Sequence, residues 1–229
     1  MAIPKKYAGL SDAVVHFVTA FRSGLRETGF IEGQNLAVEY RFAQGYYDRL
    51  STLAADLVRR QVAVIVASGG DPPALAVKAA TPTIPIVFTC STDPVKLGLV
   101  TSLNRPGGNA TGVSGLTSMM LAKRLELIRE LVSPDATIAA LVNPTSPSAE
   151  AQSKDLLAAA QAYKQRLIVL TASTVGDIDA AFATITQQHA GALIVDTDAF
   201  FLARRDQFSA LEAQLKIPAI YAQRRSTSS

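Results

Sequence analysis

The chain has 229 residues, of which 48% are hydrophobic and 18% are charged. This suits a globular protein and is long enough for one large α/β domain or two lobes. The net charge of +3 is small, and no stripe of Lys and Arg interleaved with aromatic residues occurs, which argues against a nucleic-acid partner. The single cysteine, Cys90, excludes an intrachain disulfide and a Cys-based metal site. There is no apolar run long enough to predict a membrane-spanning helix.

Short apolar runs rich in β-branched residues alternate along the chain with Ala-rich segments of helical spacing. The first helix is expected where Val15, Val18 and Leu25 share a face. The expected helices cover residues 12–28, 47–60, 118–131, 148–163, 175–188 and 201–215. The expected strands cover residues 35–42, 62–68, 84–90, 111–116, 137–143, 166–172, 192–197 and 217–222.

Several expected strands, such as those within residues 62–68, 84–90 and 192–197, lack polar alternation. Strands of this kind are buried on both faces, which is typical of a parallel sheet covered by helices. The βαβ repetition therefore predicts an open, doubly wound α/β architecture with right-handed crossovers.

A turn cluster at residues 104–109, Asn-Arg-Pro-Gly-Gly-Asn, interrupts this order. The strand after it is small and Gly-rich, and a long helix follows. We interpret this as a crossing between an N-terminal lobe of residues 1–110 and a C-terminal lobe of residues 111–229.

The common catalytic signatures do not occur: the chain has no G-x-S-x-G elbow, no Walker P-loop and no G-x-G-x-x-G after a strand. His16 and His189 lie in expected helices without a partner at metal-binding spacing. Cys90 follows a buried strand and has no histidine near it in sequence, which favours a packed thiol. The residues thus predict no catalytic group, cofactor or metal.

Small hydroxyl, amide and acidic residues follow one expected strand after another, at Ser68, Ser91, Asn143 and Asp196 among others. In an open parallel sheet, ligands bind beyond the carboxyl ends of the strands. Short polar side chains and helix N-termini at that edge suit a small zwitterion or anion. The same residue types are also the usual N-caps of the next helix, so each of them alone is better explained as a cap.

Four segments resemble the ABC transporter substrate-binding proteins, a family that includes tryptophan-binding lipoproteins. They are residues 21–70, 84–117, 122–150 and 177–221. The most specific motifs are GQN-x-x-x-EYR (residues 33–41), DP-x-x-x-GLV-x-SLNRPGGN-x-TGV (residues 93–113) and the LVNP turn (residues 141–144).

This resemblance implies a type I periplasmic-binding-protein fold, with two Rossmann-like lobes and a solute between them. It implies the solute-binding component of a bacterial ABC importer that takes an amino-acid-like or other small organic solute, carries out no catalysis and meets a permease in the periplasm. Mapped onto matching positions, the expected ligand-binding residues are Ser68, Gly69, Thr89, Ser91, Asp93, Ser114, Asn143, Thr145, Asp196 and Tyr221.

The chain departs from the family pattern at both ends. The resemblance implies an apolar first strand before residue 11 and a further segment after residue 221, and neither is seen; nor is an export signal. We therefore expect a first lobe of marginal stability, or one that pairs with a partner across the gap left by the missing strand. Two alternatives stay open: an α/β enzyme of the racemase or isomerase type, and the effector-sensing core of a transcription regulator. The first calls for a matched pair of acid–base groups, and the second for an N-terminal helix-turn-helix.

Overall fold

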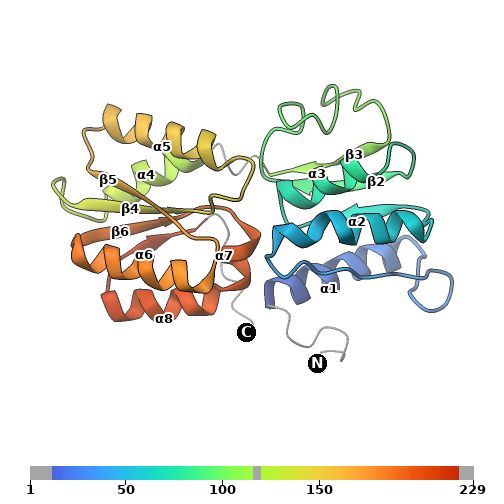
Figure 1. Ribbon diagram of the computed structural model, residues 1–229, viewed down its shortest axis with the longest axis horizontal. Coiled ribbons are helices and arrows are strands. Elements are labelled where there is room, and N and C mark those ends of the chain that lie inside the picture. The colour runs from blue at the N-terminus through green and yellow to red at the C-terminus, as the bar shows by residue number, and fades with distance from the viewer. Residues whose placement is uncertain (1–11, 116–119, 222–229) are drawn as a thin grey trace.

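The computed structural model describes residues 12–115 and 120–221, and these form two α/β lobes side by side (Figure 1). The first lobe contains α1 (Asp12–Glu27), a 3-10 turn η2 (Tyr47–Arg49), α2 (Leu50–Arg59), β1 (Ile65–Ala67), α3 (Asp71–Ala80), β2 (Ile86–Cys90) and β3 (Ala110–Ser114). The second contains α4 (Leu121–Arg129), β4 (Thr137–Val142), α5 (Ala149–Ala162), β5 (Leu167–Thr171), α6 (Val175–Gln187), β6 (Ala190–Val195), α7 (Ala199–Ala203), α8 (Arg205–Leu215) and β7 (Ala219–Ile220).

Each lobe has its own sheet, and every paired strand in both sheets is parallel. The strand order is β1-β2-β3 in the first sheet and β5-β4-β6-β7 in the second. This confirms the predicted fold class of two α/β lobes with parallel sheets. Because β3 pairs with β2 from Ala110 to Ser114, the first sheet runs past the expected boundary at residue 110. The division into two domains stays a prediction.

The second sheet is buried on both faces. Ile138 and Ala140 face a core formed with α4 and α5, and Ala139 and Leu141 face a second core formed with α6, α7 and α8. All four side chains are 1% exposed or less. This is the layering that the continuous apolar strands predict, because residues next to each other in a strand point to opposite faces.

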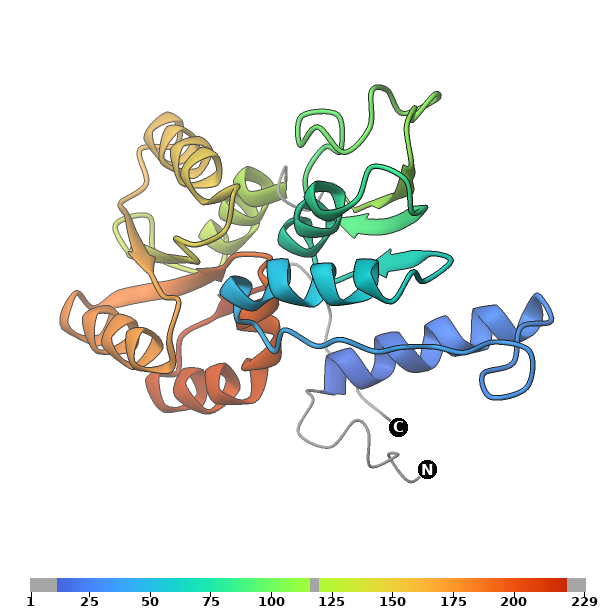
Figure 2. The same cartoon turned by 45° about the vertical axis from the view of Figure 1, so that its right-hand side comes forward.

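The first sheet is covered differently on its two faces. Ile65, Ile86 and Phe88 face α2 and α3 and are buried, and Figure 2 shows these two helices on one side of the strands. On the other face, Val87 and Val113 are 41% and 69% exposed. The first lobe therefore has one apolar core, whereas the second has two.

The expected strand at residues 35–42 is not a strand in the structure. Asn35 lies in a turn, residues 37–42 form no regular element, and the pairing in this region is a single bridge between Glu32 and Leu36. Arg41 binds Asp56 of α2 through its Nε at 2.9 Å, and Tyr40 stacks on Phe42. The strand that the alternating pattern predicted does not form, and this segment is held by side chains rather than by a ladder.

No helix among residues 12–115 and 120–221 combines the length and the apolar character that crossing a membrane requires.

Candidate functional site

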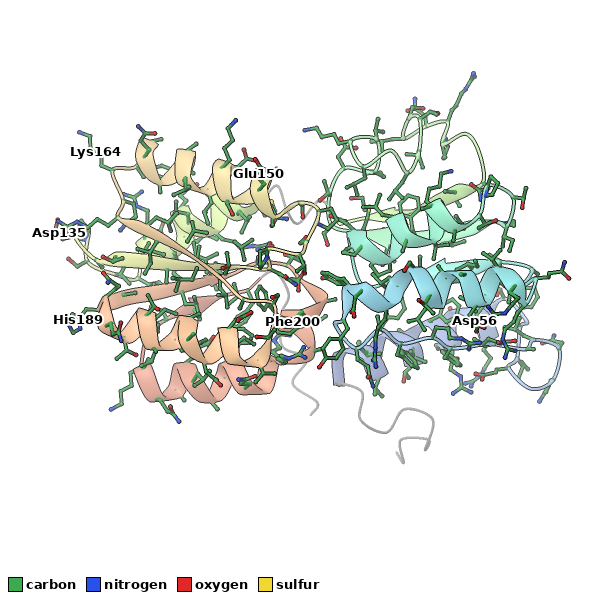
Figure 3. All side chains as sticks on the ribbon, in the orientation of Figure 1. Asp56, Asp135, Glu150, Lys164, His189 and Phe200 are labelled. Carbon is green, nitrogen blue, oxygen red and sulfur yellow. The ribbon has the colours of Figure 1, made fainter. Side chains whose placement is uncertain are left out.

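The carboxyl ends of the second sheet face the first lobe. Figure 3 shows Asp135, Lys164 and His189 at the far end of the second lobe, and Phe200 and Glu150 at the end toward the first lobe. Asp135 precedes β4, whereas Phe200 follows β6. The parallel strands thus deliver their polar C-terminal residues to the side where the lobes meet.

In the first lobe, Asp71 links the ends of neighbouring strands through hydrogen bonds. It begins α3 just after β1, is 3% exposed, and accepts hydrogen bonds from the backbone N–H groups of Ser91 at 2.7 Å and Thr92 at 3.1 Å. The hydroxyl of Thr92 donates to the same carboxylate at 2.5 Å. The carbonyl of Thr92 in turn accepts from the Ser114 hydroxyl at 2.8 Å, which brings in β3.

The other predicted residues of this lobe lie around that cluster. Ser68 is half-buried directly after β1, and Gly69 follows it with a φ of +105°, a left-handed conformation that favours glycine. Asp93 accepts the backbone N–H of Val95 at 2.9 Å, so it forms a local turn. Thr89 lies within β2, on the sheet face that carries the exposed valines.

In the second lobe, Asn143 and Asp198 form a buried pair. The Asn143 amide donates to Asp198 Oδ1 at 3.0 Å, and the Asn143 oxygen accepts from the Thr145 backbone N–H at 3.0 Å and from its hydroxyl at 2.7 Å. Asp198 also caps α7 by accepting the Phe200 N–H at 2.9 Å. Asn143 and Thr145, both predicted, are thus linked through an acid that the prediction omitted.

Asp196, at the end of β6, is only 5% exposed. Burial raises its pKa from 3.8 to about 7; the charges of Asp198 and Asp71 add to the rise, while the Thr197 backbone N–H and Arg124 oppose it. Gln152 of α5 lies between Asp196 and Ser148. In the orientation that satisfies both neighbours, its amide nitrogen is 2.9 Å from Asp196 Oδ1 and its oxygen accepts from Ser148.

Arg124 of α4 brings a positive charge to this end of the second lobe. The residue is 6% exposed, and its Nη2 donates to the Thr197 hydroxyl at 3.2 Å. Burial lowers the pKa of its guanidinium, and the nearby Asp196 opposes that shift. A buried cation beside the Asp196–Asp198 pair partly offsets the repulsion between the two carboxylates.

Direct contacts join the two lobes beside the polar end of the second sheet. The hydroxyl of Tyr47, from η2 of the first lobe, donates directly to Asp198, which follows β6. A Cβ added to Gly45, next to η2, would lie 3.1 Å from the Phe200 Cα of α7. The polar end of the second sheet therefore lies against the first lobe.

Tyr221, another predicted ligand-binding residue, contacts residues of α8. It follows β7, its hydroxyl bonds to Glu212 of α8, and Arg205 lies over its ring at 5.4 Å. Its ring packs beside the core formed with α6, α7 and α8. Its role as a ligand-binding residue, like that of the other nine, stays a prediction.

Sequence reasoning omitted four residues of this region: Asp71, Arg124, Asp198 and Tyr47. Arg124 carried a usable signal, because it sits beside Leu121 and Leu125 on the apolar stripe of a helix. Asp71 and Asp198 looked like ordinary caps. Tyr47 had no signal, since its partner is 151 residues away.

A groove on the outer face of α2, lined by Ser51, Ala55 and Arg59 among others, is a weaker candidate. Its charged groups, Asp56 and Arg59, already pair with each other. Among the residues that the structure describes, no group of three His, Cys, Asp or Glu side chains could hold a metal ion.

Comparison with known families decides the relationship. The family described as "ABC transporter substrate binding protein" matches residues 10–228 of the chain. The chain belongs to the ABC transporter substrate-binding protein family. This confirms the resemblance that the motifs at residues 33–41 and 93–113 indicated.

Individual proteins are similar to most of this chain. The chain is 29% identical over 230 residues to a "Tyrosine-binding protein" of Clostridioides difficile strain R20291, with 98% of the chain and 66% of that protein covered. It thus spans slightly less than two thirds of the curated relative. A conserved domain protein from Vibrio cholerae O1 biovar El Tor has a TM-score of 0.77 at 30% identity, covering 88% of this chain and 67% of that one.

A structure solved with a bound ligand shares the architecture. The ABC domain from Streptococcus pneumoniae, solved in complex with L-Trp, has a TM-score of 0.72 at 21% identity, covering 89% of this chain and 68% of that one. At this identity the likeness concerns the fold, which is the type I periplasmic-binding-protein fold predicted from the motifs.

Proposed function

We propose that this chain is the solute-binding part of an ABC importer and that it holds a small α-amino acid between its two lobes. The observation that carries the proposal is the polar carboxyl end of the second parallel sheet, which lies against a separate α/β lobe where Tyr47 donates to Asp198. The names of the relatives support the solute class, because one is called tyrosine-binding and another was solved with L-Trp.

The charges at the junction suit a zwitterion. Asp196 and Asp198 lie at the end of the second sheet and provide the negative charge that an α-ammonium group would neutralise. Backbone N–H groups at Gly69 and Gly70, before the N-terminus of α3, and the guanidinium of Arg124 are positive features that suit a carboxylate. We propose the predicted residues Ser68, Gly69, Ser91, Ser114, Asn143, Thr145 and Asp196 as ligand contacts.

We further propose that the chain performs no chemistry on its solute. Cys90 is buried, its thiol donates to the Thr92 carbonyl at 3.2 Å, and burial raises its thiol pKa. A thiol held protonated in this way is a poor nucleophile. Asp71 and Asp198 are buried, and each of their carboxylates accepts several hydrogen bonds from other protein groups. This is expected of residues in the wall of a binding site.

Membership of the family also supports a permease as the protein partner and a place outside the cytoplasmic membrane. Binding would shift the two lobes toward one closed arrangement through its higher affinity for that arrangement. A permease that binds the closed and the open arrangement differently would then detect whether solute is bound.

A thermal-shift screen over the 20 L-amino acids and their D-isomers tests the proposal, with small carboxylates and purines as further solutes. A solute that binds only the native state raises Tm by roughly 5–10 °C at about 100 times Kd in a chain of this size. Asp196→Asn should reduce that shift. The matched control is Asp135→Asn, an exposed acid at the opposite end of the second sheet, which should leave the shift unchanged.

The alternatives predict other results. Turnover of an amino acid, seen as racemisation or isomerisation of the added solute, would favour the enzyme. Shifts with purines alone would contradict the amino-acid class. A shift that stays unchanged in the Asp196 variant, as in the Asp135 variant, would show that the solute binds away from the strand ends.

A further inference from the structure

We propose that Tyr47 is a positioning residue that latches the two lobes together and sets how readily they close on a solute. The latch consists of Gly45, the Tyr46 ring and the Tyr47 hydroxyl in the first lobe and of Asp198, Phe200 and Arg204 in the second. The proposal rests on the proposed binding function only for its effect on affinity.

The latch lies away from the point where the first lobe gives way to the second in the sequence. The first sheet ends at Ser114, and α4 of the second lobe begins at Leu121. Figure 1 shows α7 facing the start of α2, where the latch forms. A contact at this place favours one arrangement of the two lobes over others.

The hydrogen bond at the centre of the latch is specific. The Tyr47 hydroxyl donates to Asp198 Oδ2, while Asn143 and the Phe200 N–H both donate to Asp198 Oδ1. Asn143 and Phe200 belong to the second lobe, whereas Tyr47 belongs to the first, so this carboxylate is bound from both lobes. A hydrogen bond to a charged acceptor is among the stronger ones in proteins.

The packing around this bond is close. Gly45 has a φ of +83°, and a Cβ added to it would lie 3.1 Å from both the Phe200 Cα and Arg204 Nη1. Arg204 lies over the Phe200 ring at 3.8 Å and over the Tyr46 ring at 5.8 Å. Backbone, ring and guanidinium therefore meet in one contact, which a change in lobe orientation would have to break.

The latch also reaches the candidate site. Asp198 holds Asn143, and Asn143 holds Thr145, so a chain of hydrogen bonds runs from the first lobe into two proposed ligand contacts. Approach of the lobes and placement of Asn143 are thus coupled. Tyr47 would act through these residues without touching the solute.

The test is the distance between spin labels in the ligand-free protein, at Lys96→Cys in the first lobe and Glu150→Cys in the second. Both positions are exposed, and Cys90 is buried, with a sample lacking the added cysteines as a check on its labelling. We expect a narrow distribution for the parent protein and a broader, longer one for Tyr47→Phe. Tyr46→Phe is the matched control, because Phe keeps the ring that faces Arg204.

A second pair of variants perturbs the latch without touching a hydroxyl. Gly45→Ala should lengthen the label distance, because its methyl group meets the Phe200 backbone. Gly33→Ala introduces the same backbone strain, at a φ of +86°, but meets nothing within 4 Å, so its distance should match that of the parent. Thermal melts of all four variants confirm that they remain folded.

Equal distributions for Tyr47→Phe and Tyr46→Phe would overturn the latch, and so would equal distributions for Gly45→Ala and Gly33→Ala. With an amino acid from the screen, Tyr47→Phe should weaken apparent affinity by roughly tenfold, because fewer molecules occupy the binding-competent arrangement. If no amino acid binds, the proposed function fails, while the ligand-free distances still decide the latch.

Discussion

Gly112 of β3 lies directly opposite Phe88 of β2, with no room between them for a side chain on Gly112. A Cβ added there would overlap both the carbonyl oxygen and the ring of Phe88. The backbone oxygen cannot move aside without separating two paired strands. The first sheet therefore depends on glycine at this position for the close approach that its ladder requires.

Gly112→Ala is accordingly expected to destabilise the protein by roughly 1–3 kcal/mol, the usual cost of overpacking. Urea unfolding measures it. Gly24→Ala in α1 is the control, because nothing lies within 4 Å of the added methyl group, and Ala in a helix is favoured over Gly by about 1 kcal/mol. A Gly112→Ala protein as stable as the Gly24→Ala protein would contradict the packing.

Asp71→Ala should destabilise the first lobe by roughly 3 kcal/mol, because it leaves the backbone N–H groups of Ser91 and Thr92 without their acceptor. Asp71→Asn keeps one acceptor oxygen and should lose less. Unfolding followed by circular dichroism measures both, and Asp93→Ala, which removes one exposed hydrogen bond to Val95, should cost least. Equal losses in the three variants would argue against Asp71 as the tie between strand ends.

The exposed face of the first sheet gives a third prediction. Val66, Val87 and Val113 are 39%, 41% and 69% exposed, so replacing all three with Thr removes apolar surface that water already contacts. Threonine keeps the β-branched shape that strands favour. We expect weaker binding of a hydrophobic dye and little change in stability. A large loss of stability would mean that another part of the protein covers this face.

The second lobe was the easier part to predict from sequence. Residues of β4 such as Ile138 and Leu141 are apolar because both sheet faces are covered, and that leaves a continuous pattern that needs no knowledge of the neighbours. Residues 35–42 show the limit. Their alternation predicts a strand, but a strand also needs a neighbouring strand to pair with, and here Arg41 binds a helix instead.

The candidate site divides in the same way. Polar residues at strand ends, such as Asn143 and Asp196, can be predicted from the local sequence, because the strand and the residue that ends it are neighbours in sequence. The links between them cannot, because Tyr47 and Asp198 are joined only by the arrangement of the two lobes. The burial of Arg124 likewise depends on tertiary structure, and the only local indication of it is the position of Arg124 on the apolar stripe of its helix.

The raised pKa of Asp196 predicts a pH dependence of stability. Its pKa is about 7 in the folded protein, against an ordinary value of 3.8, so between about pH 4 and pH 7 the folded state binds more protons than the unfolded state. The contribution of Asp196 is therefore present at pH 4 and is lost as pH rises toward 7, by at most about 1.4 kcal/mol per pH unit.

The difference in unfolding free energy between the parent protein and Asp196→Asn isolates this effect. It should change in favour of the variant from pH 4 to pH 7, because Asn stays neutral while Asp71, Asp198 and Arg124 remain around it. The corresponding difference for Asp135→Asn, at the opposite end of the sheet, serves as the control. A constant difference for Asp196→Asn across this range would contradict the raised pKa.

Solute binding should release protons from the same carboxyl. An ammonium group beside Asp196 favours its charged form and lowers its pKa, so binding at pH 7 should release up to about half a proton from a group whose pKa is about 7. Calorimetry in phosphate and in Tris detects this, because the two buffers differ in the heat of taking up a proton. The apparent enthalpy should differ between buffers for the parent protein and agree for Asp196→Asn. If the parent protein gives one enthalpy in both buffers, the ammonium group binds away from Asp196, and the orientation proposed for the solute is wrong even though the solute binds.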